Sequence, residues 1–439
     1  MRFYIHKLGC PKNDVDGDYI AGRLVADGHI PVKTPEEADT VLVNTCGFIE
    51  AAKEESIGEI LRLSELKKEG RLQSIFATGC LSQRYGTEML TDMPELDGAF
   101  GHGALESIAA AVGGKGTDRK AIRMEPRKLA YLSWKDRFIS DGYPYAYLKI
   151  SDGCDRPCTY CAIPGMRGRF RSRTVESIMT EAKFLAENGK KELILVSQEA
   201  TLYGYDLPGK PDIVSLLKEL ETIEQVRWIR LLYLYPAMLE TPVIKYLGSG
   251  TKTLPYFDLP FQHASTSVLE RMRRRVDQDK IDQLIHDIRS AAPDATLRTT
   301  FIVGFPGETE AEFEELRQYV ERHRFDRMGV FTYSAEEGTP AASMPNQISM
   351  EVMLDRQDQL MMIQQEIAIE KNESLRGARL EILIDRIEGE SAYGRTRGDC
   401  PDIDQEVILP ANGLKPGDFT MVTIEQVEGY DLIGKVIAA

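Results

Sequence analysis

Six of the seven cysteines fall into two groups of three whose spacing could hold iron. The second group along the chain, Cys154, Cys158 and Cys161, lies in one short stretch with the spacing C-x3-C-x2-C. A [4Fe–4S] cluster is usually held by four thiolates, so three protein ligands would leave one iron open to bind another molecule. That arrangement is typical of a catalytic cluster. The alternative is a zinc site that a distant fourth ligand completes.

The first group along the chain, Cys10, Cys46 and Cys80, is widely spaced but regular, with intervals of 36 and 34 residues. Each cysteine follows a short β-like run, at residues 2–6, 40–44 and 74–78, and precedes a helical pattern. Strands that alternate with helices predict a parallel sheet, whose strands all end at one edge. We therefore expect the three thiols to share a site, and a second cluster is its expected content. The alternative is three separate buried cysteines that pack as small hydrophobes.

The elements that must position these cysteines divide the chain into three parts. Residues 1–125 are predicted to be an N-terminal parallel α/β domain that holds the second cluster. Residues 140–370 are predicted to be an incomplete (βα)6 barrel, with a linker expected at 113–120 and a helix at 349–375 that bridges domains. Its strand-like runs lie at 145–150, 192–197, 228–234, 256–260, 296–303 and 328–333. Residues 373–439 predict a small all-β barrel, with strands at 380–387, 406–409, 420–426 and 432–437.

Composition narrows the class of protein. Of 439 residues, 42% are hydrophobic and 28% are charged, which is typical of globular domains and excludes intrinsic disorder. No apolar run is long enough to span a membrane, and the N-terminus lacks the apolar core of a secretory signal. We therefore expect a cytoplasmic protein whose cysteines stay reduced. The net charge of −15 disfavours generic nucleic-acid binding and suits a basic partner.

Residues 154–161, placed after the first strand of a βα barrel, resemble the signature of the radical S-adenosylmethionine (SAM) superfamily. The resemblance implies that the open iron binds SAM and that Tyr160 lies near its adenine. The stretch 301–308 resembles the adenine-binding segment of the superfamily, with Gly304, Pro306 and Gly307 as candidate contacts. The alternatives are a plain core aromatic for Tyr160 and an ordinary strand-to-helix turn for Gly-Phe-Pro-Gly.

A three-cysteine α/β domain, a radical-SAM barrel and a C-terminal β-barrel, called TRAM, together resemble the methylthiotransferases. The resemblance covers essentially the whole chain. It implies two [4Fe–4S] clusters and two SAM molecules with different roles. One SAM gives its methyl group to sulfur on the Cys10/Cys46/Cys80 cluster, and the other is cleaved to a radical that abstracts a substrate hydrogen. An electron donor is also implied.

The family divides by substrate, and several stretches resemble the branch that modifies the β-carbon of an aspartate in the small-subunit ribosomal protein S-twelve. These stretches are residues 8–16 and 393–404, although Cys400 and Asp402 depart mildly from the usual form. Cys400 has no local partner and is predicted to be a free loop cysteine with no role. The alternative substrate is adenosine in a transfer RNA.

Charge favours the same branch. From residue 371 onward there are 13 acidic and 8 basic residues, a net charge of −5, whereas an RNA-binding barrel should be basic. We expect this acidic barrel to meet the basic ribosomal protein, with nucleic acid met only indirectly through the ribosome. Two runs of arginines qualify the argument from acidic charge. One run is Arg167, Arg169, Arg171 and Arg173, and the other is Arg271, Arg273, Arg274 and Arg275. The first could meet substrate, SAM or barrel carboxylates; the second is interpreted as a solvated face.

Overall fold

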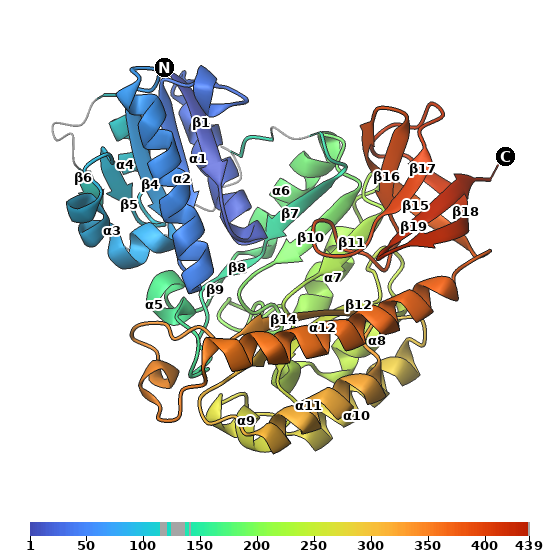
Figure 1. The fold of residues 1–439 in the computed structure, drawn as a ribbon. Helices are drawn as coiled ribbons and strands as arrows, with labels where there is room; N and C mark the ends of the chain where they lie inside the picture. Colours follow the sequence, from blue (N-terminus) through green and yellow to red (C-terminus); the bar gives the residue numbers. More distant parts are fainter. Residues whose placement is uncertain (115–120, 124–136, 140–141, 438–439) are drawn as a thin grey trace.

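The computed structural model describes residues 1–114, 121–123, 137–139 and 142–437, and these form three parts (Figure 1). Most of the linker predicted at 113–120 lies outside the described residues. The predicted fold class is confirmed: a parallel α/β part, a central six-stranded βα part and a small closed β-barrel. None of the described helices combines the length and the apolar character that a membrane crossing requires.

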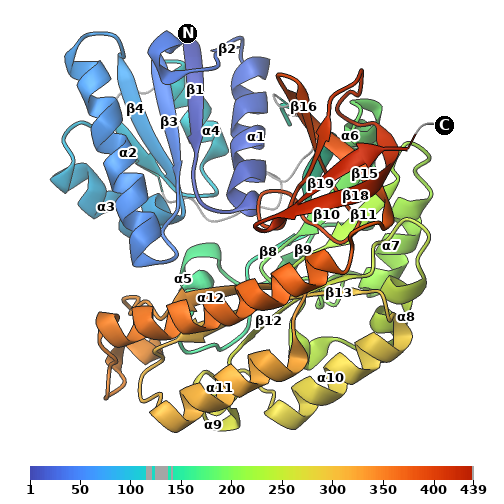
Figure 2. The same ribbon diagram turned by 45° about the vertical axis from the view of Figure 1, so that its right-hand side comes forward.

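The N-terminal part is a parallel sheet with the strand order β2-β1-β3-β4-β5-β6. Its strands are β1 (Arg2–Lys7), β2 (Ile30–Pro31), β3 (Thr40–Thr45), β4 (Ser74–Gly79), β5 (Gly98–Phe100) and β6 (Ala121–Arg123). Its helices are α1 (Pro11–Ala26), α2 (Glu50–Lys68), α3 (Cys80–Asp92) and α4 (Leu105–Val112). Two apolar clusters cover the two faces of the sheet, so β3 is buried along its whole length. Figure 2 shows α1 on the side that faces the rest of the molecule.

The central part has the six predicted parallel strands, each within a few residues of its expected position. They are β7 (Tyr145–Lys149), β10 (Glu192–Val196), β11 (Trp228–Leu231), β12 (Tyr256–Gln262), β13 (Thr296–Val303) and β14 (Arg327–Thr332). They form two three-stranded sheets, β7-β10-β11 and β12-β13-β14, and a bridge between Ile229 and Thr253 links the two. One large apolar cluster fills the space between the strands and the outer helices.

Helices cover the outside of these strands. They are α6 (Val175–Glu187), α7 (Ile213–Glu221), α8 (Thr241–Ser249), α9 (Thr266–Arg271), α10 (Gln278–Ala291) and α11 (Glu310–His323). After β7 come the short elements β8 (Ser151–Asp152), α5 (Ile163–Arg167) and β9 (Arg171–Ser172), and 3₁₀ turns lie at Pro35–Glu37, Pro236–Met238 and Pro340–Ser343. The long helix α12 (Met350–Glu373) runs across the molecule to the C-terminal barrel (Figure 1). There Asn372 donates to the carbonyl of Tyr430, so α12 links two parts as predicted.

The C-terminal part is a closed barrel with the order β15-β16-β17-β19-β18. Its strands are β15 (Arg379–Glu388), β16 (Ser391–Arg395), β17 (Val407–Pro410), β18 (Phe419–Glu428) and β19 (Asp431–Val436). The sequence predicted all of these except β16. That strand reads Ser-Ala-Tyr-Gly-Arg and has little β propensity. It forms because Gly394 lets its backbone approach β15, where an added Cβ would lie 2.5 Å from the carbonyl oxygen of Leu383.

The loop between β16 and β17 docks on the central strands, and this corrects the prediction for Cys400. Its thiol is free but 0% exposed, and it packs in one apolar cluster with Tyr147, Tyr256 and Leu383. Cys400 therefore helps to join the C-terminal barrel to the central part, and the prediction that it has no role is wrong.

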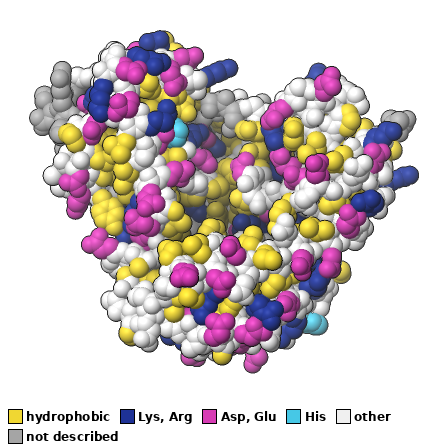
Figure 3. Space-filling view, in the orientation of Figure 1, with side chains coloured by type: hydrophobic (Ala, Val, Ile, Leu, Met, Phe, Trp, Pro, Cys, Tyr) yellow, Lys and Arg dark blue, Asp and Glu magenta, His cyan; other side chains and the backbone are white. Residues whose placement is uncertain are grey.

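Figure 3 shows the outer surface of the molecule, which is hollowed between the N-terminal and C-terminal lobes.

Candidate functional site

The N-terminal cysteines follow three neighbouring strands of one sheet. Cys10 caps α1 after β1, Cys46 directly follows β3, and Cys80 begins α3 after β4. Two glycines with positive φ let these loops close on one another. A Cβ on Gly9 (φ 92°) would lie 2.7 Å from the Cβ of Cys46, and one on Gly79 (φ 96°) would lie 2.4 Å from the carbonyl oxygen of Thr45. The three cysteines therefore share one edge of the sheet.

A buried asparagine in the first turn of α1 ties these loops together. Asn13 Nδ2 donates to the carbonyl oxygens of Leu8 at 2.9 Å and Thr45 at 3.0 Å, and Asn44 donates back to the carbonyl of Asn13 at 2.6 Å. Asn13 Oδ1 faces the thiol of Cys80 at 4.0 Å. One side chain thus joins the segments that carry all three cysteines. The sequence pattern did not reveal this role, although Asn13 stands three residues after the first cysteine.

Burial keeps the thiols of Cys46 and Cys80 protonated in the absence of a metal. Burial, together with the neighbouring thiols Cys80 and Cys10, raises the pKa of Cys46 to about 12. The pKa of Cys80 is also raised by burial, while the guanidinium of Arg167 opposes that rise. Metals bind cysteine as thiolate and release its proton, so a cation at this position would relieve the cost of the buried charge.

The second group lies on the loop between β8 and α5. The amide of Cys154 donates to the carbonyl of Gly168 at 3.1 Å, and the amide of Cys161 donates to the carbonyl of Cys158 at 3.2 Å. Gly153 (φ 83°) cannot be replaced, because a Cβ there would lie 2.1 Å from the carbonyl oxygen of Arg169. Burial raises the pKa of Cys154 to about 11 and that of Cys161 to about 12.

Each group offers three free thiols, the donor type that iron–sulfur clusters use. Among the described residues, no three His, Cys, Asp or Glu side chains gather closely enough to hold one metal ion. Both groups of three thiols have the donor chemistry of a cluster site, in which each thiolate binds a different iron.

Each group has one buried arginine beside a cysteine sulfur. In the second group, Arg274 is 4% exposed and its Nη1 lies 3.7 Å from Cys158 Sγ and 3.4 Å from Tyr160 Oη. Its guanidinium also stacks 4.5 Å from the ring centre of Tyr235. The prediction that this arginine run is a solvated face is therefore wrong for Arg274. It holds for Arg273 and Arg275, which are exposed.

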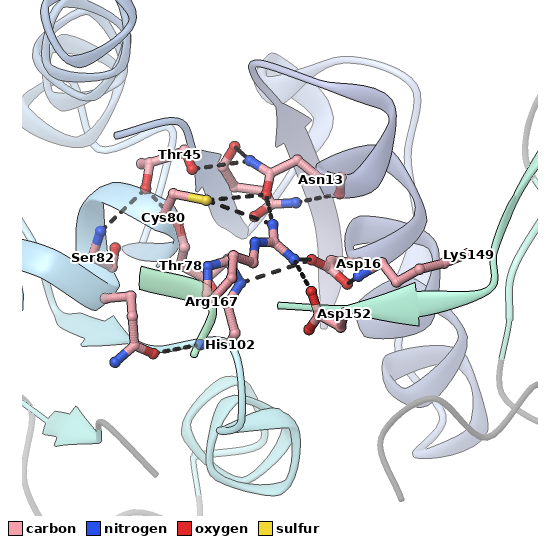
Figure 4. A network of polar contacts seen from close by, with 12 residues as sticks. Asn13, Asp16, Thr45, Thr78, Cys80, Ser82, His102, Lys149, Asp152 and Arg167 are labelled. Atoms are coloured by element: carbon pink, nitrogen blue, oxygen red, sulfur yellow. Dashed lines mark hydrogen bonds and ion pairs between the residues drawn. The ribbon is translucent and has the colours of Figure 1, made fainter. Parts of the chain in front are cut away.

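Arg167 has the corresponding position in the first group (Figure 4). Its Nη2 donates to Asn13 Oδ1 at 2.7 Å and to Cys80 Sγ at 3.5 Å. Since Arg167 ends α5, directly after the second group of cysteines, it connects the two groups physically. Of the alternatives for this arginine run, ion pairing applies to Arg173, which binds buried Glu181, whereas the side chain of Arg169 is 88% exposed.

The Gly-Phe-Pro-Gly segment forms a strand-to-helix turn between β13 and α11. The carboxylate of Glu308 accepts the amides of Gly304 at 2.8 Å and Phe305 at 3.2 Å, and it pairs with Arg356 of α12 at 2.7 Å. Behind it, His263 Nε2 lies 3.7 Å from the same carboxylate. Burial raises the pKa of Glu308 to about 7 and lowers that of His263 to about 3. This turn is therefore fixed by buried polar contacts from three elements.

The candidate cofactor contacts differ in their surroundings. Gly304 has φ 76°, and a Cβ there would lie 2.1 Å from Met353 Cγ. Packing against this side chain of α12 is therefore enough by itself to require a glycine. Gly307 has φ 77° with open space around the missing Cβ, while Pro306 between them is buried. Tyr160 packs against the apolar cluster that contains Phe305. The structure thus brings Tyr160 and the Gly-Phe-Pro-Gly turn to one region beside Cys158.

Comparison with protein families matches three stretches of the chain. The Radical SAM superfamily matches residues 148–320, the Uncharacterized protein family UPF0004 matches residues 2–101, and the TRAM domain matches residues 377–437. Each stretch falls in one of the three parts of the fold.

Curated relatives match over the full length. The ribosomal protein uS12 methylthiotransferase RimO of Clostridioides difficile is 43% identical over 439 residues, covering 100% of this chain and 99% of the relative. The enzyme of the same name from Pelotomaculum thermopropionicum is 45% identical and covers 98% of each chain. Among solved structures, the radical SAM methyltransferase TsrM from Kitasatospora setae has a TM-score of 0.54 at 14% identity, over 89% of this chain and 80% of TsrM. That likeness concerns the fold.

Proposed function

We propose that this chain, which belongs to the RimO family of ribosomal protein uS12 methylthiotransferases, replaces a hydrogen on the β-carbon of a uS12 aspartate with a methylthio group. The observation that carries the proposal is the pair of three-thiol groups, each beside a buried arginine and joined through Arg167. A radical SAM enzyme of this family binds a [4Fe–4S] cluster and SAM. The finer proposal is that this chain binds two clusters, one at each group.

The assignment of residues follows from the donor sets. We propose that Cys154, Cys158 and Cys161 hold the cluster that binds SAM. The first group, Cys10, Cys46 and Cys80, holds the other cluster. Tyr160, Gly304, Pro306 and Gly307 are proposed to contact the adenosyl part of SAM. Support comes from the shared apolar surroundings of Tyr160 and Phe305 and from the open space at Gly307.

When bound, two SAM molecules, the clusters and cluster-bound sulfur supply the carbon radical and the methylthio group, because no protein acid or base breaks an unactivated C–H bond at neutral pH. The side chains of this chain position these groups and exclude water. Arg274 and Arg167 each place a fixed cation beside one cysteine sulfur, which offsets the negative charge of buried thiolates. Glu308 holds the amides of the proposed adenine-binding turn, so its backbone geometry is set before ligand arrives.

The remaining partners are proposals of the same kind. We propose that the C-terminal barrel helps to bind basic uS12, using the exposed carboxylates Glu390, Glu425 and Glu428. Other acidic residues of this barrel, such as Asp399 and Asp404, already face arginines of the central part and are not available for a partner. An electron donor is required for each SAM cleavage. The seven free cysteines favour a reducing cytoplasm.

Domain limits are proposed at 1–125 for the N-terminal domain, 140–370 for the radical-SAM domain and 373–439 for the TRAM domain. The three stretches matched by families lie inside these limits. The end of α12 at Glu373, followed by β15 from Arg379, supports the last limit.

The molecule that carries the methylthio group after the reaction shows which substrate the enzyme uses. Anaerobically reconstituted protein is incubated with SAM and reductant, and with either purified ribosomal subunits or transfer RNA. Mass spectrometry then looks for a methylthio group in the uS12 aspartate peptide and in the nucleosides. We expect the modification only in uS12. Modification of adenosine with unmodified uS12 would establish the alternative, a transfer-RNA methylthiotransferase of the same architecture.

A further inference from the structure

Arg167 is a buried cation that reaches from one cysteine group to the other. It ends α5, whose first residue, Ile163, is two positions after Cys161. Its side chain is only 2% exposed, and its Nη2 lies 3.5 Å from the sulfur of Cys80 in the N-terminal domain. Figure 4 shows the guanidinium at the centre of a polar network between the domains. Arg274, by contrast, contacts a cysteine of its own domain.

The far side of the guanidinium is anchored by carboxylates from both domains. Its Nη1 lies 2.7 Å from Asp16 of α1 and 3.5 Å from Asp152 of β8. Asp16 also pairs with the buried Lys149 of β7. A planar guanidinium can bind carboxylates on one edge and an amide oxygen and a sulfur on the other, whereas a lysine ammonium has no such fixed geometry. The network therefore fixes both the charge and the orientation of Arg167.

We propose that Arg167 is a positioning residue that aligns Cys80 and raises the electron affinity of a cluster bound by Cys10, Cys46 and Cys80. Hydrogen bonds to the ligand sulfurs and nearby charge set the reduction potential of such clusters. A fixed positive charge 3.5 Å from a ligand sulfur stabilises an added electron, so its removal lowers the potential. Because Arg167 belongs to the loop of the second group, each site then depends on the position of the other. This inference rests on the proposed two-cluster function.

The test uses the full chain with Cys154→Ala, Cys158→Ala and Cys161→Ala as the parent, so that any remaining cluster signal comes from the N-terminal site. Into this parent we introduce Arg167→Gln, which removes the charge, and Arg167→Lys, which keeps it. Arg169→Gln, an exposed arginine of the same segment, is the matched control. Iron content and the reduction potential, followed by electron paramagnetic resonance, are measured for each.

We expect Arg167→Gln to keep its iron while its reduced-to-oxidised ratio at a fixed potential falls at least tenfold, equivalent to about 59 mV for one electron. Arg167→Lys should recover part of this change, and Arg169→Gln should match the parent. An unchanged potential in iron-loaded Arg167→Gln overturns the inference and leaves the proposed function standing. Loss of iron in both Arg167 variants also overturns it, because the side chain would then be needed for iron to bind and not to set the reduction potential. A parent that binds no iron overturns the two-cluster function together with this inference.

Discussion

Each group of three cysteines has one buried arginine near a sulfur, and the surrounding residues hold that cation in place. Arg274 is fixed by the ring of Tyr235, while Arg167 is fixed by Asp16 and Asn13. Thiols buried this deeply resist ionisation, as the raised pKa of Cys46 and Cys161 indicates. The positive charges of the two arginines therefore stabilise the thiolate form of the cysteines in these buried sites.

His263 makes a contribution to the free energy of unfolding that decreases as the pH falls. Its pKa falls from 6.5 to about 3 because it is fully buried, so the native state holds it neutral. That stability is present above pH 6.5 and is lost as the pH falls toward 3. His263→Asn keeps an acceptor for the amide of Ser265 but cannot be protonated. Urea unfolding of the cluster-free protein between about pH 6.5 and 4.5 should show a wild-type loss steeper by up to about 1.4 kcal/mol per pH unit. Parallel curves would contradict this assignment.

A comparison of alanine substitutions at Gly304 and Gly307 distinguishes the cost of backbone strain from the cost of crowded packing. Both have φ near the left-handed region, but only Gly304 faces Met353. Gly304→Ala should lower the free energy of unfolding by about 2–5 kcal/mol, from strain plus overpacking. Gly307→Ala should cost only about 1 kcal/mol, from strain. Chemical denaturation measures both, and adding Met353→Ala to Gly304→Ala should recover part of the loss. Equal costs for the two glycines would rule out the packing explanation.

Loops at the ends of β1, β3 and β4 carry one cysteine group, and the loop after β8 carries the other. This arrangement could be predicted because hydrophobic runs and their spacing fix the order of strands and helices, and parallel strands end at one edge. Three of the predicted strands, at 40–44, 74–78 and 296–303, match β3, β4 and β13 within one residue. The two arginine contacts could not be predicted, because they depend on how α5 and α9 pack against distant elements.

The contact between the C-terminal and central parts was also beyond the sequence. This contact is built from specific ion pairs, whereas the composition shows only a net negative charge. Arg395 is buried between Glu192 of β10 and Asp385 of β15, and Arg327 of β14 binds Asp399. Pairing across three strands depends on register, which the linear pattern does not contain.

Arg395→Met tests whether this contact holds the barrel in place. The substitution leaves Asp385 without its buried arginine and leaves Glu192 with Arg230 alone, so the free energy of unfolding should fall by about 3–5 kcal/mol. Arg376→Met removes an exposed pair with Glu373 and should cost at most about 1 kcal/mol. Denaturant unfolding gives both values, and limited proteolysis should release the C-terminal barrel faster only in Arg395→Met. Equal stability of the two variants would show that the barrel is held by its apolar contacts.

The three parts form one continuous molecule around the two cysteine groups. The N-terminal domain contacts the central part through α1, where Tyr19 donates to the buried carboxylate of Glu181. α12 spans from Met353, beside the Gly-Phe-Pro-Gly turn, to the C-terminal barrel. Figure 3 shows a hollow between the two upper lobes, and charged side chains of both signs cover the lobes.

The central claim is that the two cysteine groups bind separate clusters with separate tasks. Two triple variants test it, one with Cys154, Cys158 and Cys161 changed to Ala and one with Cys10, Cys46 and Cys80 changed to Ala. The measurements on anaerobically reconstituted protein are iron content, SAM cleavage and methylthiolation of uS12. Wild type should bind about eight irons and each variant about four. The first variant should not cleave SAM, whereas the second should cleave SAM without forming product. About four irons in the wild type, all retained when Cys10, Cys46 and Cys80 are replaced, would contradict the account.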